Sequence, residues 1–233
     1  MYKLVVILLL ITLFVNYREG VVFKHCASCE NSVIHMIDVP LFSEGFVTRV
    51  YSTCKTQGIV LNPTRNFNSA KGTKANYFQL KTQVDVNGVL TDDLLNRCCQ
   101  ILRTKVHYGS VTNRYRVFAR IYEDNNDNLA WHYDNNFTNG KRYTLVIPIY
   151  YSDCNTSQFM IRDRKDATER IIDVPIGKGV LYDGSDVYHR ITNQTRGCTR
   201  IVLIVPLYEN ESKSFLGTVR ESVRDLTYKV MTL

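Results

Sequence analysis

Short segments rich in β-branched and aromatic residues dominate the chain from residue 114 onward. Turn-forming pairs separate them, such as Asn139-Gly140, Asp183-Gly184 and Arg196-Gly197. The segments predicted as strands are 116–122, 143–151, 158–162, 170–174, 179–182 and 200–207. Because no helical periodicity lies between them, they predict an antiparallel sandwich or barrel rather than a parallel sheet with crossover helices.

The part of the chain before this region carries helical signals. Residues 42–51 have apolar side chains at helical spacing. At Thr91 a helix-capping side chain precedes two acidic residues and an apolar stripe, which predicts the start of a second helix. The polar segment 62–74 contains Pro63 and Gly72 and predicts a loop. The predicted fold class is therefore α+β: a jelly roll (double-stranded β-helix) with supporting N-terminal helices.

The length of 233 residues suits one domain with modest extensions. Hydrophobic residues make up 45% and charged residues 22%, as in ordinary globular proteins, so extensive disorder is not expected. The predicted regions are a signal peptide or membrane anchor at 1–20, a helical support region at 21–110, the jelly-roll core at 111–210 and a C-terminal extension at 211–233.

The first of these regions is a membrane-targeting pattern. Met1-Tyr2-Lys3 precedes an apolar run from Leu4 to Val15. This run is shorter than the roughly 20 residues of a spanning helix and suits the apolar part of a signal peptide. Arg18 and Gly20 match a cleavage site poorly, so an uncleaved anchor stays an equal alternative, and a buried strand or helix a third. The pattern predicts the secretory pathway, with the protein either membrane-anchored through this segment or secreted and lumenal.

Cysteines and glycosylation motifs are compatible with that route. The cysteines are odd in number, at Cys26, Cys29, Cys54, Cys98, Cys99, Cys154 and Cys198. Cys26 and Cys29 have the spacing of a zinc or redox pair, but no second such pair follows, so we expect a disulfide participant there. Glycosylation sequons lie at Asn136, Asn155, Asn193 and Asn210. A glycan on Asn136 would conflict with the metal site described next.

The charge balance is basic but does not point to nucleic acid. Twenty-nine Lys and Arg against 22 Asp and Glu give a formal net charge of +7. The basic residues are scattered, and no recognition helix or zinc finger accompanies them, so no specific nucleic-acid binding is expected.

A candidate metal site begins at Trp131-His132-Tyr133-Asp134. In an extended segment, side chains two residues apart lie on the same face, so His132 and Asp134 can bind one ion together. His189 lies between two predicted strands that can return it to this pair. Two imidazoles and one carboxylate form the facial triad of non-haem Fe(II) oxygenases, which leaves adjacent positions open for a bidentate 2-oxo acid and for O2. The same ligands also serve zinc hydrolases, so zinc stays an alternative.

Arg200 is a candidate anion-binding residue. It opens the apolar run 201–205, eleven residues after His189. Burying a guanidinium in such a segment is costly without an anion, and arginine can hold a carboxylate through two parallel hydrogen bonds. An internal salt bridge or a solvent-facing position are the structural alternatives.

These residues resemble the prolyl-hydroxylase branch of the 2-oxoglutarate/Fe(II) oxygenases over about residues 116–208. The matching elements occur in the family's order: Tyr122 ending a strand, His132-Tyr133-Asp134, the strand opened by Arg142-Tyr143-Thr144, a turn with Pro175 and Gly179 before Val180-Leu181-Tyr182, the distal His189, and Thr199-Arg200 opening the last strand. The family's Gly-Gly stretch is absent, and residues 153–158 stand in its place. Contacts to the second substrate therefore cannot be transferred.

The resemblance implies iron ligation by His132, Asp134 and His189, and binding of the 2-oxoglutarate C5 carboxylate by Arg200. Arg190 and Arg196 are alternatives to Arg200. Tyr122 matches a tyrosine near the co-substrate, although core packing explains it equally well.

The implied activity is a 2-oxoglutarate-dependent dioxygenase that hydroxylates a second substrate and releases succinate and CO2. The implied cofactors are Fe(II), 2-oxoglutarate as co-substrate and, as an accessory, L-ascorbate. A protein or peptide substrate, such as peptidyl proline or lysine, is favoured over a small molecule. A catalytically inactive, membrane-anchored jelly-roll binding or structural protein is the alternative from another class.

Overall fold

The computed structural model describes residues 33–61, 70–124, 126–134, 136–213, 215, 217–219, 221 and 222. The expected signal or anchor segment, Cys26, Cys29 and much of the expected C-terminal extension lie outside the described residues. Within the described ranges, no helix combines the length and hydrophobicity needed to cross a bilayer.

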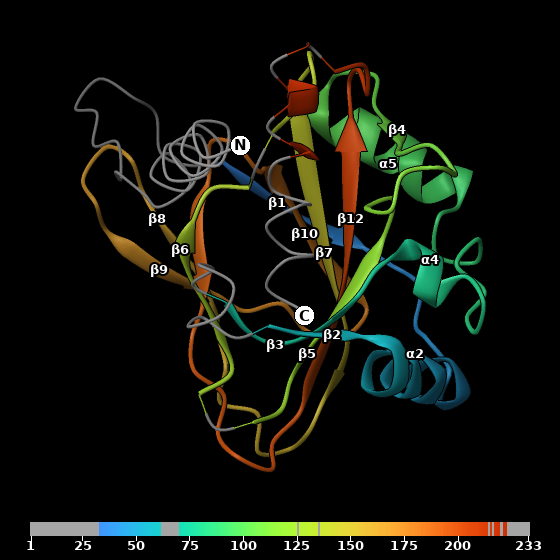
Figure 1. Cartoon of the computed structure of the whole chain (residues 1–233). Coiled ribbons are helices and arrows are strands. Elements are labelled where there is room, and N and C mark those ends of the chain that lie inside the picture. Colours follow the sequence, from blue (N-terminus) through green and yellow to red (C-terminus); the bar gives the residue numbers. More distant parts are fainter. Residues whose placement is uncertain are drawn as a thin grey trace, which may run out of the picture.

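The described strands form one curled antiparallel sheet (Figure 1). Its order is β1-β10-β7-β12-β5-β3-β6-β11-β8-β9, with β2 beside β3 and β4 beside β12. The strands are β1 (Ile34–Asp38), β2 (Ile59–Leu61), β3 (Ala70–Ala75), β4 (His107–Tyr108), β5 (Phe118–Tyr122), β6 (Asn128–His132), β7 (Arg142–Tyr151), β8 (Phe159–Arg162), β9 (Glu169–Ile172), β10 (Lys178–Asp183), β11 (Tyr188–Ile191) and β12 (Arg200–Tyr208). This arrangement is a jelly roll, as the sequence predicts.

Strand β3 joins the two halves of the sheet. Residues 73–75 pair with β5, and residues 70 and 71 pair with β6. Gly72 lies between the two pairings with φ +132°, and a Cβ there would lie 2.6 Å from the carbonyl oxygen of Ile121. Only glycine accommodates this bend and the close approach of β5. Prediction of a loop over 62–74 is therefore wrong for 70–74, and residues 62–69 lie outside the described ranges. The polar sequence of β3 hid a strand that cross-strand pairing stabilises.

Three helices cover the outer face of the larger half-sheet: α2 (Glu44–Gln57), α4 (Tyr77–Leu80) and α5 (Asp92–Leu102). The Thr91 hydroxyl accepts a hydrogen bond from the Leu94 amide, so the predicted helix start at Thr91 is confirmed. The helices lie on one side of β12, β7 and β10, and β6, β8 and β9 lie on the other (Figure 1). The region expected as helical support also supplies β1, β2, β3 and β4.

Alternation along the strands produces two cores. Ala119, Ile121 and Leu203 belong to the core under the helices, whereas Phe118, Tyr122 and Val202 belong to the core between the two half-sheets. The second core lines the interior of the jelly roll. The even-numbered residues of β5, and the even-numbered residues at the start of β12, therefore direct their side chains into that interior.

Candidate metal centre and anion pocket

A β-bulge in β6 directs His132 into the interior. His132 pairs with His189 and Leu129 pairs with Ile191, so Ala130 and Trp131 together lie opposite Arg190 alone. The Ala130 carbonyl oxygen is 2.8 Å from His132 Nδ1. Because a carbonyl can only accept, Nδ1 carries the proton and Nε2 keeps the lone pair that a metal ion needs.

His189 on β11 is oriented in the same way. Its Nδ1 lies 3.0 Å from the Val187 carbonyl oxygen, which leaves Nε2 as the ligand atom. The side chain is buried, and its ring centroid is 4.2 Å from that of His132. The Tyr182 hydroxyl lies 3.2 Å from His189 Nε2 and therefore borders the atom that would bind the metal ion.

Asp134 completes the cluster. Its Oδ1 lies 3.7 Å from His132 Nε2 and 3.9 Å from His189 Nε2. Its Oδ2 accepts a hydrogen bond from the Thr144 hydroxyl, and its amide donates to the Gly184 carbonyl oxygen at 2.7 Å. One ligand atom from each of the three residues can be chosen so that all lie within 4.8 Å of one another. The structure therefore brings the three predicted ligands together.

Gly184 makes this placement of the carboxylate sterically possible. A Cβ at this position would lie 2.7 Å from Asp134 Oδ2 and 2.8 Å from Thr144 Oγ1. Sequence reasoning identified Asp183-Gly184 only as a turn. It named Thr144 only as part of the opening of a strand and missed its contact with Asp134.

The protonation state suits a divalent cation. Burial by itself raises the pKa of Asp134, but His132, His189 and Arg142 outweigh it and hold the pKa well below its ordinary value. Burial, assisted by the charge of His132, lowers the pKa of His189 to about 4. At neutral pH the cluster therefore offers a carboxylate and a neutral His189 imidazole, the forms in which these side chains bind metals. Two nitrogen donors and one oxygen donor fit Fe(II), whose remaining coordination positions would be filled by non-protein ligands.

Arg200 is buried at the start of β12, with 2% of its surface exposed. It pairs with Tyr122 on one side and Tyr151 on the other. Its Nη1 donates to the Ser157 carbonyl oxygen at 3.1 Å, whereas its Nε has no hydrogen-bond partner. No carboxylate of the described residues forms an ion pair with it. Within the described part of the chain neither structural alternative is seen, because Arg200 has no salt bridge there and does not face solvent. Its buried unpaired donor is suited to an anion.

The two competing arginines lie elsewhere. Arg190 is next to His189 on β11 and therefore on the opposite face, where its guanidinium lies 4.8 Å from the Trp131 ring centroid and 3.5 Å from a Glu169 oxygen. Arg196 is exposed in the turn before β12. Tyr122 faces the interior with 2% exposure, a position compatible with both co-substrate contact and core packing.

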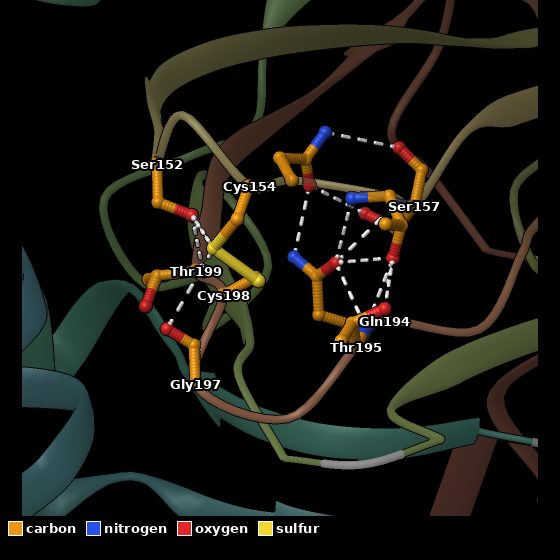
Figure 2. The surroundings of a disulfide bond; sticks show 10 residues. Ser152, Cys154, Ser157, Gln194, Thr195, Gly197, Cys198 and Thr199 are labelled. Carbon is orange, nitrogen blue, oxygen red and sulfur yellow. Dashed lines mark hydrogen bonds between the residues drawn. A yellow bond between two sulfur atoms is a disulfide. The ribbon is translucent and has the colours of Figure 1, made fainter.

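A disulfide and a buried glutamine hold the segment that contains Ser157 (Figure 2). Cys154 and Cys198 join the β7–β8 and β11–β12 connections. Gln194, 1% exposed, accepts from the amides of Thr156 and Ser157 at 3.1 and 3.3 Å and donates to Asn155 Oδ1 at 2.8 Å. The segment in place of the family's Gly-Gly stretch thus presents the Ser157 carbonyl to Arg200. Sequence reasoning missed both Gln194 and Ser157.

Comparison by sequence yields no matching family model and no significantly matching curated protein. Comparison of structures shows similarity to the non-heme alpha ketoglutarate dependent carbocyclase SnoK from nogalamycin biosynthesis, at 10% identity and TM-score 0.57, covering 80% of this chain and 85% of SnoK. An oxidoreductase of the 2OG-Fe(II) oxygenase family from Burkholderia pseudomallei is similar at 9% identity and TM-score 0.54, covering 78% and 88%. EctD from S. alaskensis, solved with 2-oxoglutarate and 5-hydroxyectoine, is similar at 8% identity and TM-score 0.54, covering 76% and 72%. The chain therefore has the jelly-roll fold of 2-oxoglutarate/Fe(II) oxygenases.

Proposed function

We propose that the protein is an Fe(II)- and 2-oxoglutarate-dependent dioxygenase. The observation that carries this proposal is the cluster of His132, Asp134 and His189, which lies inside the same jelly roll as Arg200, a buried arginine with an unpaired donor. Bound Fe(II) and 2-oxoglutarate would supply the activation of O2, with release of succinate and CO2 and hydroxylation of a second substrate.

The chain's own residues contribute position and charge. The Ala130 and Val187 carbonyls fix the imidazole tautomers. Thr144 keeps Asp134 Oδ2 hydrogen-bonded, so that Oδ1 would be the oxygen that holds the metal ion. Arg200 would receive the distal carboxylate of 2-oxoglutarate, which would satisfy the buried guanidinium. The apolar walls around Phe159 and Val202 limit the access of water to the interior.

The second substrate is proposed as a peptidyl proline or lysine, with L-ascorbate as an accessory. The protein is proposed to reside in the secretory pathway, held by its N-terminal segment or secreted. The disulfide between Cys154 and Cys198 supports this proposal, since disulfides persist in oxidising compartments. The proposal for the substrate rests on the family resemblance.

The test is anaerobic Fe(II) titration followed by measurement of succinate formed from 2-oxoglutarate in air. Wild-type protein is expected to bind one Fe(II) and to form succinate. Asp134→Ala is expected to lose both, whereas Asp38→Ala, which changes an exposed aspartate on β1, keeps both. Retention of zinc without any response to 2-oxoglutarate would indicate a hydrolase instead. Binding of neither ligand would indicate an inactive jelly-roll binding protein.

A further inference from the structure

A second arginine, Arg120, lies on the interior face near Arg200. Arg120 occupies β5 between Phe118 and Tyr122, which both belong to the interior core, so alternation places Arg120 on the same face. It pairs with Val202 on β12, two residues from Arg200. Diagonal neighbours of this kind lie roughly 7–8 Å apart. Arg120 is thus near Arg200 but in a different row of side chains.

Arg120 borders a small cavity that extends across three strands. The cavity measures about 40 Å³. Its walls include apolar Ile59 and Leu61, aromatic Tyr115, and the cations Lys74, Arg114 and Arg120. Among the described residues that line it, none is acidic. A cavity of this size and charge suits a carboxylate group rather than a large ligand.

Two of these cations face each other directly. Lys74 on β3 is the cross-strand partner of Arg120 on β5, so the two side chains lie side by side at the cavity. Arg120 Nη1 is buried and has no hydrogen-bond partner. The Lys74 ammonium lies 4.1 Å from the Phe118 ring centroid and 4.8 Å from that of Tyr115, which fixes it at the cavity. An anion in the cavity would satisfy the unpaired Arg120 donor.

The neighbouring strand suits a peptide. Among the described residues, β2 pairs with β3 alone, so its other edge offers backbone donors and acceptors. Val60 in this strand is 70% exposed. The net charge of +7 favours an acidic partner at long range. An extended peptide along β2 could therefore place an acidic side chain in the cavity.

We propose that this cavity binds a carboxylate of the second substrate, so that the protein acts on an acidic peptide. This inference rests on the proposed function, and it names the chemistry of the substrate rather than that of the co-substrate.

The test uses the full-length protein and isothermal titration calorimetry at low salt. The probes are hexaglutamate, a neutral Gly-Ser hexapeptide and inorganic phosphate, each titrated first into the protein alone and then with Mn(II) and the unreactive co-substrate analogue N-oxalylglycine. Wild-type protein is expected to bind hexaglutamate at least tenfold more tightly than the neutral peptide. Arg120→Gln and Lys74→Met are each expected to weaken that binding roughly tenfold or more, the loss of one charged hydrogen bond.

Lys81→Met is the matched control. The Lys81 ammonium also lies over aromatic rings, 5.5 Å from the centroid of Tyr77 and 5.0 Å from that of Phe78, but does not line the cavity. This variant should bind hexaglutamate within twofold of wild type. Arg120→Gln should unfold at a temperature no lower than wild type, because the buried Nη1 of Arg120 has no partner among the described residues to lose. A purely structural arginine would lower that temperature.

Several outcomes would overturn the inference. One is equal hexaglutamate affinity in all variants, and another is no preference of wild type for hexaglutamate over the neutral peptide. A third is phosphate binding as tight as that of hexaglutamate, which would indicate a site for free anions. Weakened N-oxalylglycine binding in Arg120→Gln with unchanged hexaglutamate binding would assign the cavity to the co-substrate. Failure of the proposed function is distinguishable, since N-oxalylglycine and succinate assays would then be negative while the hexaglutamate pattern persisted.

Discussion

The Thr144 hydroxyl donates a hydrogen bond to Asp134 Oδ2, while Asp134 Oδ1 faces both imidazoles of the cluster. The bond joins a polar group buried in β7, 1% exposed, to a carboxylate that follows β6. It holds the two carboxylate oxygens in different roles. One oxygen is kept for the ion, and the other is satisfied by the protein.

Thr144→Val removes this donor with little change in shape. We expect Fe(II) affinity to fall roughly 10- to 100-fold, the usual cost of losing a partner of a metal ligand. Anaerobic Fe(II) titration measures the change. Thr53→Val is the control, because Thr53 is equally buried but its hydroxyl bonds within α2 to the Arg49 carbonyl. Similar iron affinity in wild type and Thr144→Val would contradict the role given to Thr144.

Gly184→Ala should disturb the same carboxylate through volume. The added Cβ would overlap Asp134 Oδ2 and Thr144 Oγ1, so we expect lost iron binding and roughly 1–3 kcal/mol less stability, as for other overpacked sites. Urea denaturation and Fe(II) titration measure the two effects. Gly45→Ala in α2 is the comparison, because its Cβ would meet only Arg49 Nη1 at 3.5 Å and should stabilise the helix by about 0.5–1 kcal/mol. Equal behaviour of both variants would contradict the steric argument.

The ligands could be predicted from the sequence because they depend on local spacing and on strand order. His132 and Asp134 share a face in any extended segment. His189 lies between the predicted strands 179–182 and 200–207, which can return it to that pair. The contacts of Thr144 and Gly184 could not be predicted, because they depend on register between strands and on a turn carbonyl that meets the Asp134 amide. The bulge in β6 could not be predicted either. Leu129 and His132 both face the interior because Ala130 and Trp131 together lie opposite the single residue Arg190.

The same limit applied to the fold. Apolar strands such as β7 and β12 are evident from composition, and their bounds agree with prediction within a residue. Strand β3 has only two alanines, a glycine, a threonine and two lysines, so its pairing with β5 and β6 decides its conformation. The Lys74 and Arg120 pair follows from that register and was therefore not foreseen.

Arg200→Met should separate co-substrate binding from iron binding. Removing the guanidinium deletes the charged donors that would hold the distal carboxylate, so we expect 2-oxoglutarate affinity to fall roughly 10- to 150-fold, equivalent to about 1.5–3 kcal/mol. Iron should still bind, since Arg200 is not a ligand. Anaerobic calorimetry with Fe(II) present measures both. Arg190→Met should keep co-substrate affinity, because Arg190 lies on the opposite face of β11 from His189. Loss in Arg190→Met with retention in Arg200→Met would reverse the assignment.

The disulfide between Cys154 and Cys198 should stabilise both the fold and the surroundings of Arg200. It closes a loop with a sequence separation of 44 residues, and its loss is expected to lower the free energy of unfolding by about 2–4 kcal/mol. The double variant Cys154→Ser, Cys198→Ser should also bind 2-oxoglutarate more weakly, because Ser157 and its carbonyl contact with Arg200 lie in the released segment. Urea denaturation with and without dithiothreitol measures the stability: reductant should weaken wild type and change the double variant much less. An equal effect of reductant on both proteins would show that this bond does not carry the stabilisation.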